Sequence, residues 1–234
     1  MPVSYEVHNK VAVVTYDDGK ANVYTTEALE ELNSALDRSE ADPAVTALLL
    51  VGRPARFSAG FDLATMTSSE ASMRALVAAG GRFTARLLLH PMPVVAACTG
   101  HALAAGALVL LAADRRIGVT GPYKIGLNEV AIGMPLPRWA VELARFRMPA
   151  SQFNRIILGE IGGPQEAVAA GFLDEVVAED SLMDVAGAEA HRLAELRRGA
   201  VSGTKERARR TVADRMLDRM DEDLASVGSP APAG

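Results

Sequence analysis

The stretch RFSAGFDL at residues 56–63 is the most informative part of this sequence. It follows the apolar run VTALLLVG at residues 45–52, which is typical of a buried strand. Gly60 has no Cβ and the two residues before it have small side chains, so the backbone at this turn can come close to a ligand. The N–H groups around Gly60 and Phe61 are therefore expected to face a site and to bind an anionic oxygen.

Composition narrows the class of protein. A chain of 234 residues of which 49% are hydrophobic can form one sizeable domain. A formal net charge of -5 argues against a general binder of nucleic acid or of membrane surfaces. Cys98 is the only cysteine, which excludes an intrachain disulfide and a cysteine-based zinc site. The first residues lack the charged and apolar regions of a secretory signal, so we expect a cytoplasmic protein.

One uncharged segment has the length of a membrane span. Residues 91–113 carry no formal charge, and roughly 20 apolar residues suffice to cross a bilayer. However, Pro91, Pro93 and the sequence TGH at residues 99–101 interrupt the segment. A buried strand, a turn and a buried helix explain it better than a membrane-spanning helix does.

The rest of the chain alternates strand and helix patterns, which favours an α/β domain with mainly parallel strands. Helix signals include a threonine cap at Thr25 or Thr26, a long helix with Gly80 and Gly81 in its middle, and a Pro164 start with a Gly171 end. Strands are predicted at residues 11–16, 45–51, 94–98, 117–120 and 172–177, and helices from about residue 26 and at 70–89, 104–113, 138–147, 151–159 and 164–170.

The last part of the chain is predicted to be helical and is richer in charge. The basic run KERARR at residues 205–210 is read either as a solvated helix face or as a set of cations that meet a phosphate-bearing ligand. The sequence alone does not decide between these two readings.

Several motifs occur in an order and spacing that resemble the crotonase (enoyl-CoA hydratase/isomerase) superfamily over about residues 10–180. They are FSAGFDL at 57–63, PVVAA at 93–97, GHALAAG at 100–106, GLNE at 126–129 and QEAVAAGFLDEVV at 165–177. The resemblance implies a spiral of ββα units with a C-terminal helical trimerisation region. It also implies an acyl-CoA thioester substrate, a homo-trimer or hexamer, and no metal or redox cofactor, since coenzyme A is part of the substrate.

The same resemblance divides the chain. Residues 1–180 would form the acyl-CoA-binding core and residues 181–227 a C-terminal helical oligomerisation region. Residues 228–234 are expected to be a disordered tail. An apolar set in the C-terminal helices would need covering by another subunit; it consists of Leu182, Val185, Leu193 and Leu196.

The resemblance also assigns two backbone donors for the thioester oxygen. By position they are the N–H groups of Phe61 and Ala105, the second at the start of an apolar helix whose dipole would add to the stabilisation. Ala105 stands where the family usually has glycine. The N–H remains, but alanine would be strained there if the position requires a positive φ.

The acid/base groups point to one branch of the family. Hydratases of the family hold water between two glutamates, and the position of the first is Leu108 here, which cannot activate water. The second position matches Glu129, and its surroundings, with Pro135 and Trp139 following, resemble the Δ3,Δ2-enoyl-CoA isomerases, which use one glutamate. One carboxylate suffices physically, because the C2 proton of a 3-enoyl thioester is both allylic and α to the carbonyl. An apolar Leu108 would keep water out and raise the pKa of the base.

Further substrate-binding residues are carried over from the family by position. Lys20 and Arg56 could reach a phosphate of coenzyme A, Trp139 is either a wall of the acyl pocket or a core anchor, and Asp62 either contacts the ligand or closes a turn. His101 is expected to be structural. The full predicted set is Lys20, Ala21, Arg56, Ser58, Ala59, Gly60, Asp62, Leu63, Leu108 and Trp139, with Glu129, Phe61 and Ala105 as the catalytic groups.

Three functions follow in order of preference. The first is an enoyl-CoA isomerase of fatty acid metabolism with Glu129 as its only base. The second is an enoyl-CoA hydratase or another crotonase-type lyase, which would need a second acid/base group near Leu108. The third is a non-catalytic acyl-CoA-binding or assembly subunit, which the unusual Ala105 and Leu108 leave open.

Overall fold

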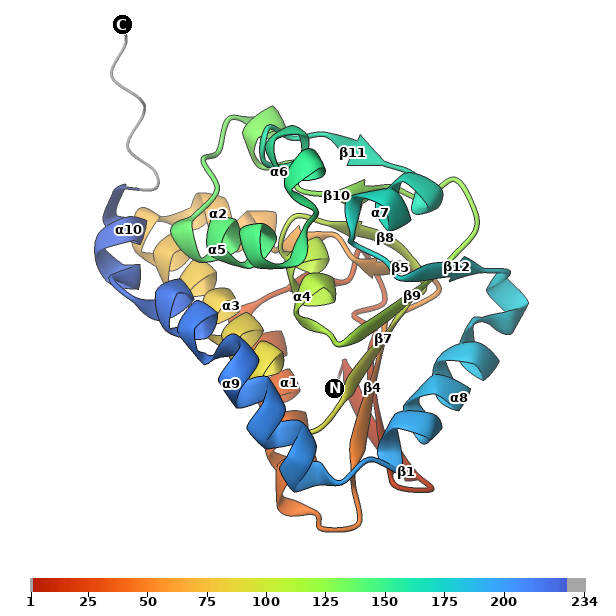
Figure 1. Cartoon of the computed structure of the whole chain (residues 1–234). Coiled ribbons are helices and arrows are strands. Elements are labelled where there is room, and N and C mark those ends of the chain that lie inside the picture. Colours follow the sequence, from red (N-terminus) through yellow and green to blue (C-terminus); the bar gives the residue numbers. More distant parts are fainter. Residues whose placement is uncertain (1, 227–234) are drawn as a thin grey trace, which may run out of the picture.

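The computed structural model describes residues 2–226, in which short strands alternate with helices (Figure 1). The strands are β1 (Val3–His8), β2 (Val11–Tyr16), β3 (Val23–Tyr24), β4 (Ala47–Val51), β5 (Ala55–Ser58), β6 (Gly60–Phe61), β7 (Val94–Cys98), β8 (Gly100–Leu103), β9 (Arg115–Val119), β10 (Ile125–Gly126), β11 (Ile161–Gly162) and β12 (Glu175–Val177). The helices are α1 (Thr26–Ala41), α2 (Leu63–Ser68), α3 (Glu70–Leu89), α4 (Ala105–Ala112), α5 (Arg138–Arg147), α6 (Ala150–Ile157), α7 (Pro164–Ala170), α8 (Leu182–Ala194), α9 (Arg198–Leu217) and α10 (Met220–Ser226), with short 3-10 helices η1 (Val130–Ile132) and η2 (Glu179–Ser181).

The strands form a spiral. β4, β7 and β9 are neighbours in a large sheet of order β1-β2-β4-β7-β9-β12, in which only the β1–β2 pair is antiparallel. The strands that follow them, β5, β8 and β10, pair in parallel in a second sheet, to which β11 adds antiparallel. Helices come after each strand pair. The predicted α/β spiral of ββα units and its mainly parallel pairing are therefore confirmed.

Local sequence explains where the longer helices begin and end. Thr25 caps α1 by accepting a hydrogen bond from the Ala28 N–H at 3.1 Å, which chooses between the two threonines predicted as caps. Pro164 occupies the first turn of α7, and Gly171 ends that helix with a φ of +86°. Helix α3 has the predicted bounds and is capped by Ser69.

Both faces of the large sheet are covered, so its central strands are apolar throughout. Every residue of β4 and β7 is buried. On one face lies the main core, which includes α1, α3 and α4, and on the other face lies α8. Leu182 of α8 is 3% exposed in this second cluster, so it needs no other subunit to cover it. Leu196 stays 46% exposed, and the trimer or hexamer remains a prediction.

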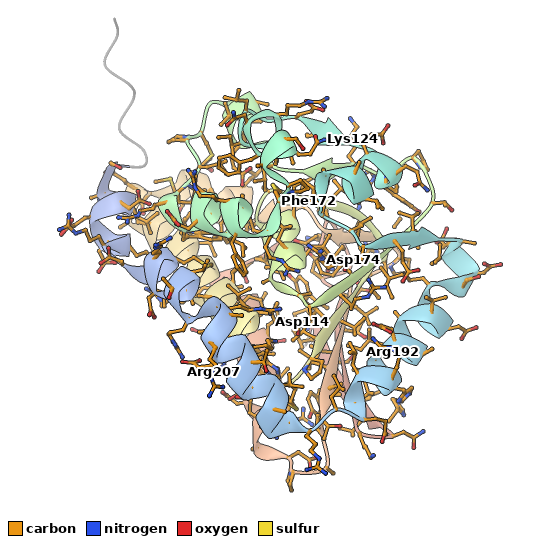
Figure 2. The ribbon with its side chains drawn as sticks, in the orientation of Figure 1. Asp114, Lys124, Phe172, Asp174, Arg192 and Arg207 are labelled. Atoms are coloured by element: carbon orange, nitrogen blue, oxygen red, sulfur yellow. The ribbon has the colours of Figure 1, made fainter. Side chains whose placement is uncertain are left out.

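The C-terminal helices α9 and α10 pack on α3 and α5 of the same chain (Figure 1). An ion-pair cluster holds α9 there. Lys205 Nζ lies 2.8 Å from Asp114 Oδ2, and Arg209 binds the other oxygen of the same carboxylate. Figure 2 shows Asp114 in the interior and Arg207 on the outer side of α9. For Lys205 and Arg209 the reading as a solvated helix face is therefore wrong, because both cations are paired with Asp114 of the core. Binding of a phosphate-bearing ligand by the basic run stays a prediction.

Other differences concern short elements. The segment predicted as a turn at 99–101 contains the start of strand β8, and the predicted strand at 172–177 is reduced to β12. The uncharged segment at residues 91–113 forms the buried strand β7 and the buried helix α4, as predicted. Within residues 2–226, none of the helices joins sufficient length to sufficient apolar character for a membrane crossing.

Candidate active site

The turn after β5 brings two chain segments into close contact. Gly60 has a φ of +96°, which disfavours any residue with a side chain. A Cβ at position 60 would lie 3.0 Å from Ala104 Cβ and 3.4 Å from Ala105 N. The absence of a side chain therefore lets β6 lie against the N-terminus of α4.

Two backbone N–H groups flank this contact. The Asp62 N–H donates to the Tyr24 carbonyl at 3.0 Å, and successive N–H groups along a strand point to opposite sides, so the Phe61 N–H points away from β3. Ala105 is the first residue of α4, where N–H groups have no partner within the helix and the helix dipole is positive. The structure brings together the two segments predicted to bind the thioester oxygen. Their role as donors stays a prediction.

Backbone strain occurs beside Ala105 and not at it. Ala104, the residue before the helix, has φ +50° and ψ -124°, a conformation that costs a non-glycine residue roughly 1–3 kcal/mol. Ala105 belongs to the helix and is absent from the residues with positive φ. The strain expected if position 105 took a positive φ is thus found at the preceding residue.

A cavity of about 320 Å³ opens next to these segments. Its lining is almost wholly apolar, and Glu129 is the only titratable side chain among the lining residues described. The lining residues are Ala21, Val23, Ala59, Phe61, Leu63, Met66, Val77, Ala104, Leu108, Asn128, Glu129, Ile132, Met134, Pro135, Pro137 and Trp139.

Glu129 lies just after β10 and its backbone is fixed by the turn that follows. Its carbonyl accepts hydrogen bonds from the Ile132 N–H at 3.1 Å and the Met134 N–H at 2.9 Å. One oxygen of the side chain is unpaired: Oε2 is buried and has no hydrogen-bond partner among the described residues. Burial raises the pKa of Glu129 to about 7, so the carboxylate can accept and return a proton near neutral pH.

Leu108 and Trp139 close the cavity on the protein side. Leu108, in α4, is 1% exposed, and Trp139, in α5, is also 1% exposed. Leu63, at the other side, is 67% exposed, so the cavity opens to solvent there. Position 108, where the resemblance stated above places the first hydratase glutamate, therefore holds a buried apolar side chain.

The predicted substrate-binding residues divide into two groups. Five of them line the cavity: Ala21, Ala59, Leu63, Leu108 and Trp139. Ser58 is fully buried, and its Oγ accepts a hydrogen bond from the Gly60 N–H at 3.1 Å, so it shapes the turn from inside. Asp62 caps α2 through a 2.7 Å hydrogen bond from the Thr65 N–H, which agrees with the turn-closing alternative.

The two cations predicted to reach a phosphate do not line the cavity. Lys20 and Arg56 are both exposed, and Arg56 lies on β5 opposite His101 of β8. His101 has a structural contact, because its Nδ1 accepts a hydrogen bond from the Lys124 N–H at 3.0 Å. Phosphate binding by Lys20 and Arg56 stays a prediction.

Sequence reasoning missed part of the cavity wall. Met66 and Val77 come from helices α2 and α3, where an apolar residue facing a cavity has the same periodicity as one facing the core. Asn128 also lines the cavity, and the motif GLNE at residues 126–129 does not by itself predict this. Its Oδ1 is buried and has no hydrogen-bond partner within residues 2–226, and it is adjacent in sequence to Glu129.

Several known proteins resemble this chain in sequence and in fold. The family model described as enoyl-CoA hydratase/isomerase matches residues 6–229. An enoyl-CoA hydratase/isomerase family protein from Pseudomonas syringae has a crystal structure with a TM-score of 0.92 and 42% sequence identity, over 96% of this chain and 97% of that one. The human mitochondrial enoyl-CoA delta isomerase 1 is 31% identical over 94% of this chain and 74% of its own length. A probable enoyl-CoA hydratase from Bacillus subtilis is 32% identical over 73% of this chain and 67% of its own length.

Proposed function

The chain belongs to the enoyl-CoA hydratase/isomerase family, and from this premise we propose that it is an enoyl-CoA isomerase. The reaction moves a double bond from position 3 to position 2 of an acyl-CoA thioester. The observation that carries the proposal is that Glu129 is the only titratable side chain lining the cavity, among the residues described. The position that the family resemblance gives to the other hydratase glutamate holds Leu108.

The proposed reaction begins with binding of the thioester oxygen. The N–H groups of Phe61 and Ala105 would donate to it, and the positive end of the α4 dipole would add to their effect. In other enzymes, loss of one such donor costs about 3–4 kcal/mol of transition-state stabilisation. The charge that develops on this oxygen during the reaction is what the two donors are proposed to stabilise.

Glu129 is then proposed to move the proton. Its carboxylate removes a proton from C2, and the electron pair of the C–H bond delocalises over the thioester and the 3,4 double bond as a dienolate. The protonated Glu129 returns the proton at C4, which leaves the double bond between C2 and C3, conjugated with the carbonyl. Atoms balance without water or a redox partner, and coenzyme A takes part only as the carrier of the acyl group.

The apolar lining supports this chemistry. Leu108 and Trp139 would exclude water from the dienolate and so limit its capture by solvent protons. The raised pKa of Glu129 brings its basicity close to working pH, which suits a group that must both take and return a proton.

Product analysis tests the proposal directly. The purified protein is incubated separately with a 3-enoyl-CoA and with a 2-enoyl-CoA, and the products are separated. We expect conversion of the first to the 2-enoyl isomer and little addition of water to the second. Strong hydration of 2-enoyl-CoA would contradict the proposal and favour a hydratase. Binding of acyl-CoA with neither reaction would favour a non-catalytic acyl-CoA-binding subunit.

A further inference from the structure

Two adjacent glycines, Gly80 and Gly81, lie in the middle of α3, the long helix along one side of the cavity. Glycine is the least favourable residue in a helix interior apart from proline. Neither Gly80 nor Gly81 has a positive φ, so backbone conformation does not require glycine at these positions. Both residues are buried. The remaining physical reason for glycine is that neighbouring groups come too close to the helix for any side chain.

Those neighbouring groups include two aromatic walls of the cavity. A Cβ at position 80 would clash with Cζ of Phe61 and lie 2.5 Å from its Cε1. A Cβ at position 81 would lie 3.1 Å from both Cγ and Cδ1 of Trp139. Phe61 therefore packs directly against Gly80, and Trp139 packs directly against Gly81.

The second glycine also contacts the C-terminal helices. A Cβ at position 81 would lie 2.8 Å from Cε of Met220, the first residue of α10. Met220 is 7% exposed and belongs to the main core. Helix α10 of the same chain thus packs against α3 next to Trp139. The space behind Trp139, on the side away from the cavity, is therefore filled.

We propose that the Gly80–Gly81 pair sets the dimensions of the acyl site, with a different task for each glycine. Gly81 lets Trp139 lie back against α3 and so determines how long an acyl chain the closed end accommodates. Gly80 lets the Phe61 ring lie on α3 and so positions the residue whose N–H faces the thioester. This inference rests on the proposed function, because it takes the cavity to hold the acyl chain of a thioester.

The two tasks predict different results for the same substitution. In Gly81→Ala the new methyl group moves Trp139 toward the cavity, which removes space at the end farthest from solvent. Affinity for dodecanoyl-CoA should fall on the order of tenfold or more relative to butanoyl-CoA, because a change of one methylene in an apolar pocket has an effect of this size. In Gly80→Ala the displaced Phe61 should lower kcat for 3-enoyl-CoA of every chain length, with a smaller effect on KM.

A matched control separates these effects from loss of helix flexibility. Gly187 lies in α8, and a Cβ there would meet nothing within 4 Å. Gly187→Ala should therefore keep the wild-type chain-length profile and kcat. Binding is measured by titration calorimetry with the saturated butanoyl-, octanoyl- and dodecanoyl-CoA, so the readout does not depend on turnover.

A second variant keeps the inference testable if Gly81→Ala does not fold. Trp139→Leu enlarges the closed end of the cavity and should raise the affinity for dodecanoyl-CoA relative to butanoyl-CoA. An unchanged chain-length profile in folded Gly81→Ala, or in Trp139→Leu, would overturn the role given to Gly81. The proposed function would survive that result. If the wild-type protein binds none of the three thioesters, the proposed function fails and the inference fails with it.

Discussion

Two largely buried carboxylates of this chain, Asp114 and Glu129, have opposite surroundings. Asp114 accepts hydrogen bonds from the Val94 N–H at 2.7 Å and from Lys205 Nζ at 2.8 Å, and it also binds Arg209. Burial by itself would raise the pKa of Asp114, but the charges of Lys205 and Arg209 outweigh it and hold the pKa below its ordinary value. In the part of the chain that the structure describes, Glu129 has no such cationic partner, and burial raises its pKa to about 7.

The difference distinguishes a structural carboxylate from a reactive one. A buried ion with all its partners stays charged and fixes the elements around it, here α9 against the core. A buried carboxyl group without a cationic partner can change its protonation state near neutral pH, and its unpaired oxygen can bind what enters the cavity. We therefore expect groups around the cavity to lower the free energy of unfolding, and groups around Asp114 to raise it.

The largest expected effect is on catalysis. Glu129→Gln keeps the size of the side chain but removes the base, so isomerisation should fall by on the order of 10²–10⁴. Exchange of the C2 proton with deuterated solvent should fall with it, while acyl-CoA binding changes little. If exchange persists in the variant, another group removes the proton, and Glu129 is not the reactive member of the pair.

The second prediction concerns the structural member of the pair. Asp114→Asn leaves Lys205 and Arg209 buried without their counter-charge, so the free energy of unfolding should fall by about 3–5 kcal/mol. Urea titration measures this loss. Arg207→Gln on the outer side of α9 is the control and should change stability by less than about 0.5 kcal/mol. Equal effects of the two substitutions would mean that the Asp114 cluster does not hold α9.

The third prediction concerns how much the ionised Glu129 lowers the free energy of unfolding, and it uses pH to measure this. Its pKa rises from an ordinary 4.5 to about 7 on folding, so the folded protein binds the proton more tightly than the unfolded chain does. The stability of the folded state that depends on a protonated Glu129 is fully present below about pH 4.5 and is lost as the pH rises through 7. Glu129→Gln should thus be more stable than wild type above pH 7, by up to ~3 kcal/mol, and should gain nothing at pH 4.5.

Thermal unfolding of both proteins at the two pH values checks this sign. A stability difference that does not change with pH would mean that the Glu129 carboxylate reaches solvent. The activity of the wild type should follow the same group in the opposite sense, rising with pH as Glu129 loses its proton near pH 7.

The long elements could be predicted from sequence because their signals are local. Strands β2 and β7 and helices α3, α5 and α7 have the predicted bounds, set by apolar periodicity, caps and breakers. Strands β5, β8, β10 and β11 are two to four residues long, too short for alternation to be recognised. What makes them strands is pairing with segments that are distant in sequence.

The same distinction holds for the two carboxylates. The sequence predicts a shared site for Glu129 and Leu108 because the family resemblance gives each of them a position. Both residues line one cavity. The partners of Asp114 could not be predicted, because Lys205 lies 91 residues away and the charge pattern of α9 is the same whichever face meets the core. Burial depends on tertiary packing, and so does the pKa that separates a structural carboxylate from a reactive one.

The smallest expected effect comes from the strained backbone beside the cavity. Ala104, with φ +50° and ψ -124°, lies in a region that glycine occupies readily, so Ala104→Gly should relieve strain of roughly 1–3 kcal/mol. Glycine also makes the unfolded chain more flexible, which offsets about 0.4–1 kcal/mol of this gain. The net result should be a stability increase of ~1 kcal/mol in urea titration. Ala188→Gly in the exposed part of α8 should have the opposite sign, a loss of ~1 kcal/mol, because it has helical geometry and only the cost of glycine remains. A loss of stability in both variants would show that Ala104 is not strained. Of the two cavity residues Ala104 and Glu129, only Glu129 would then lower the free energy of unfolding.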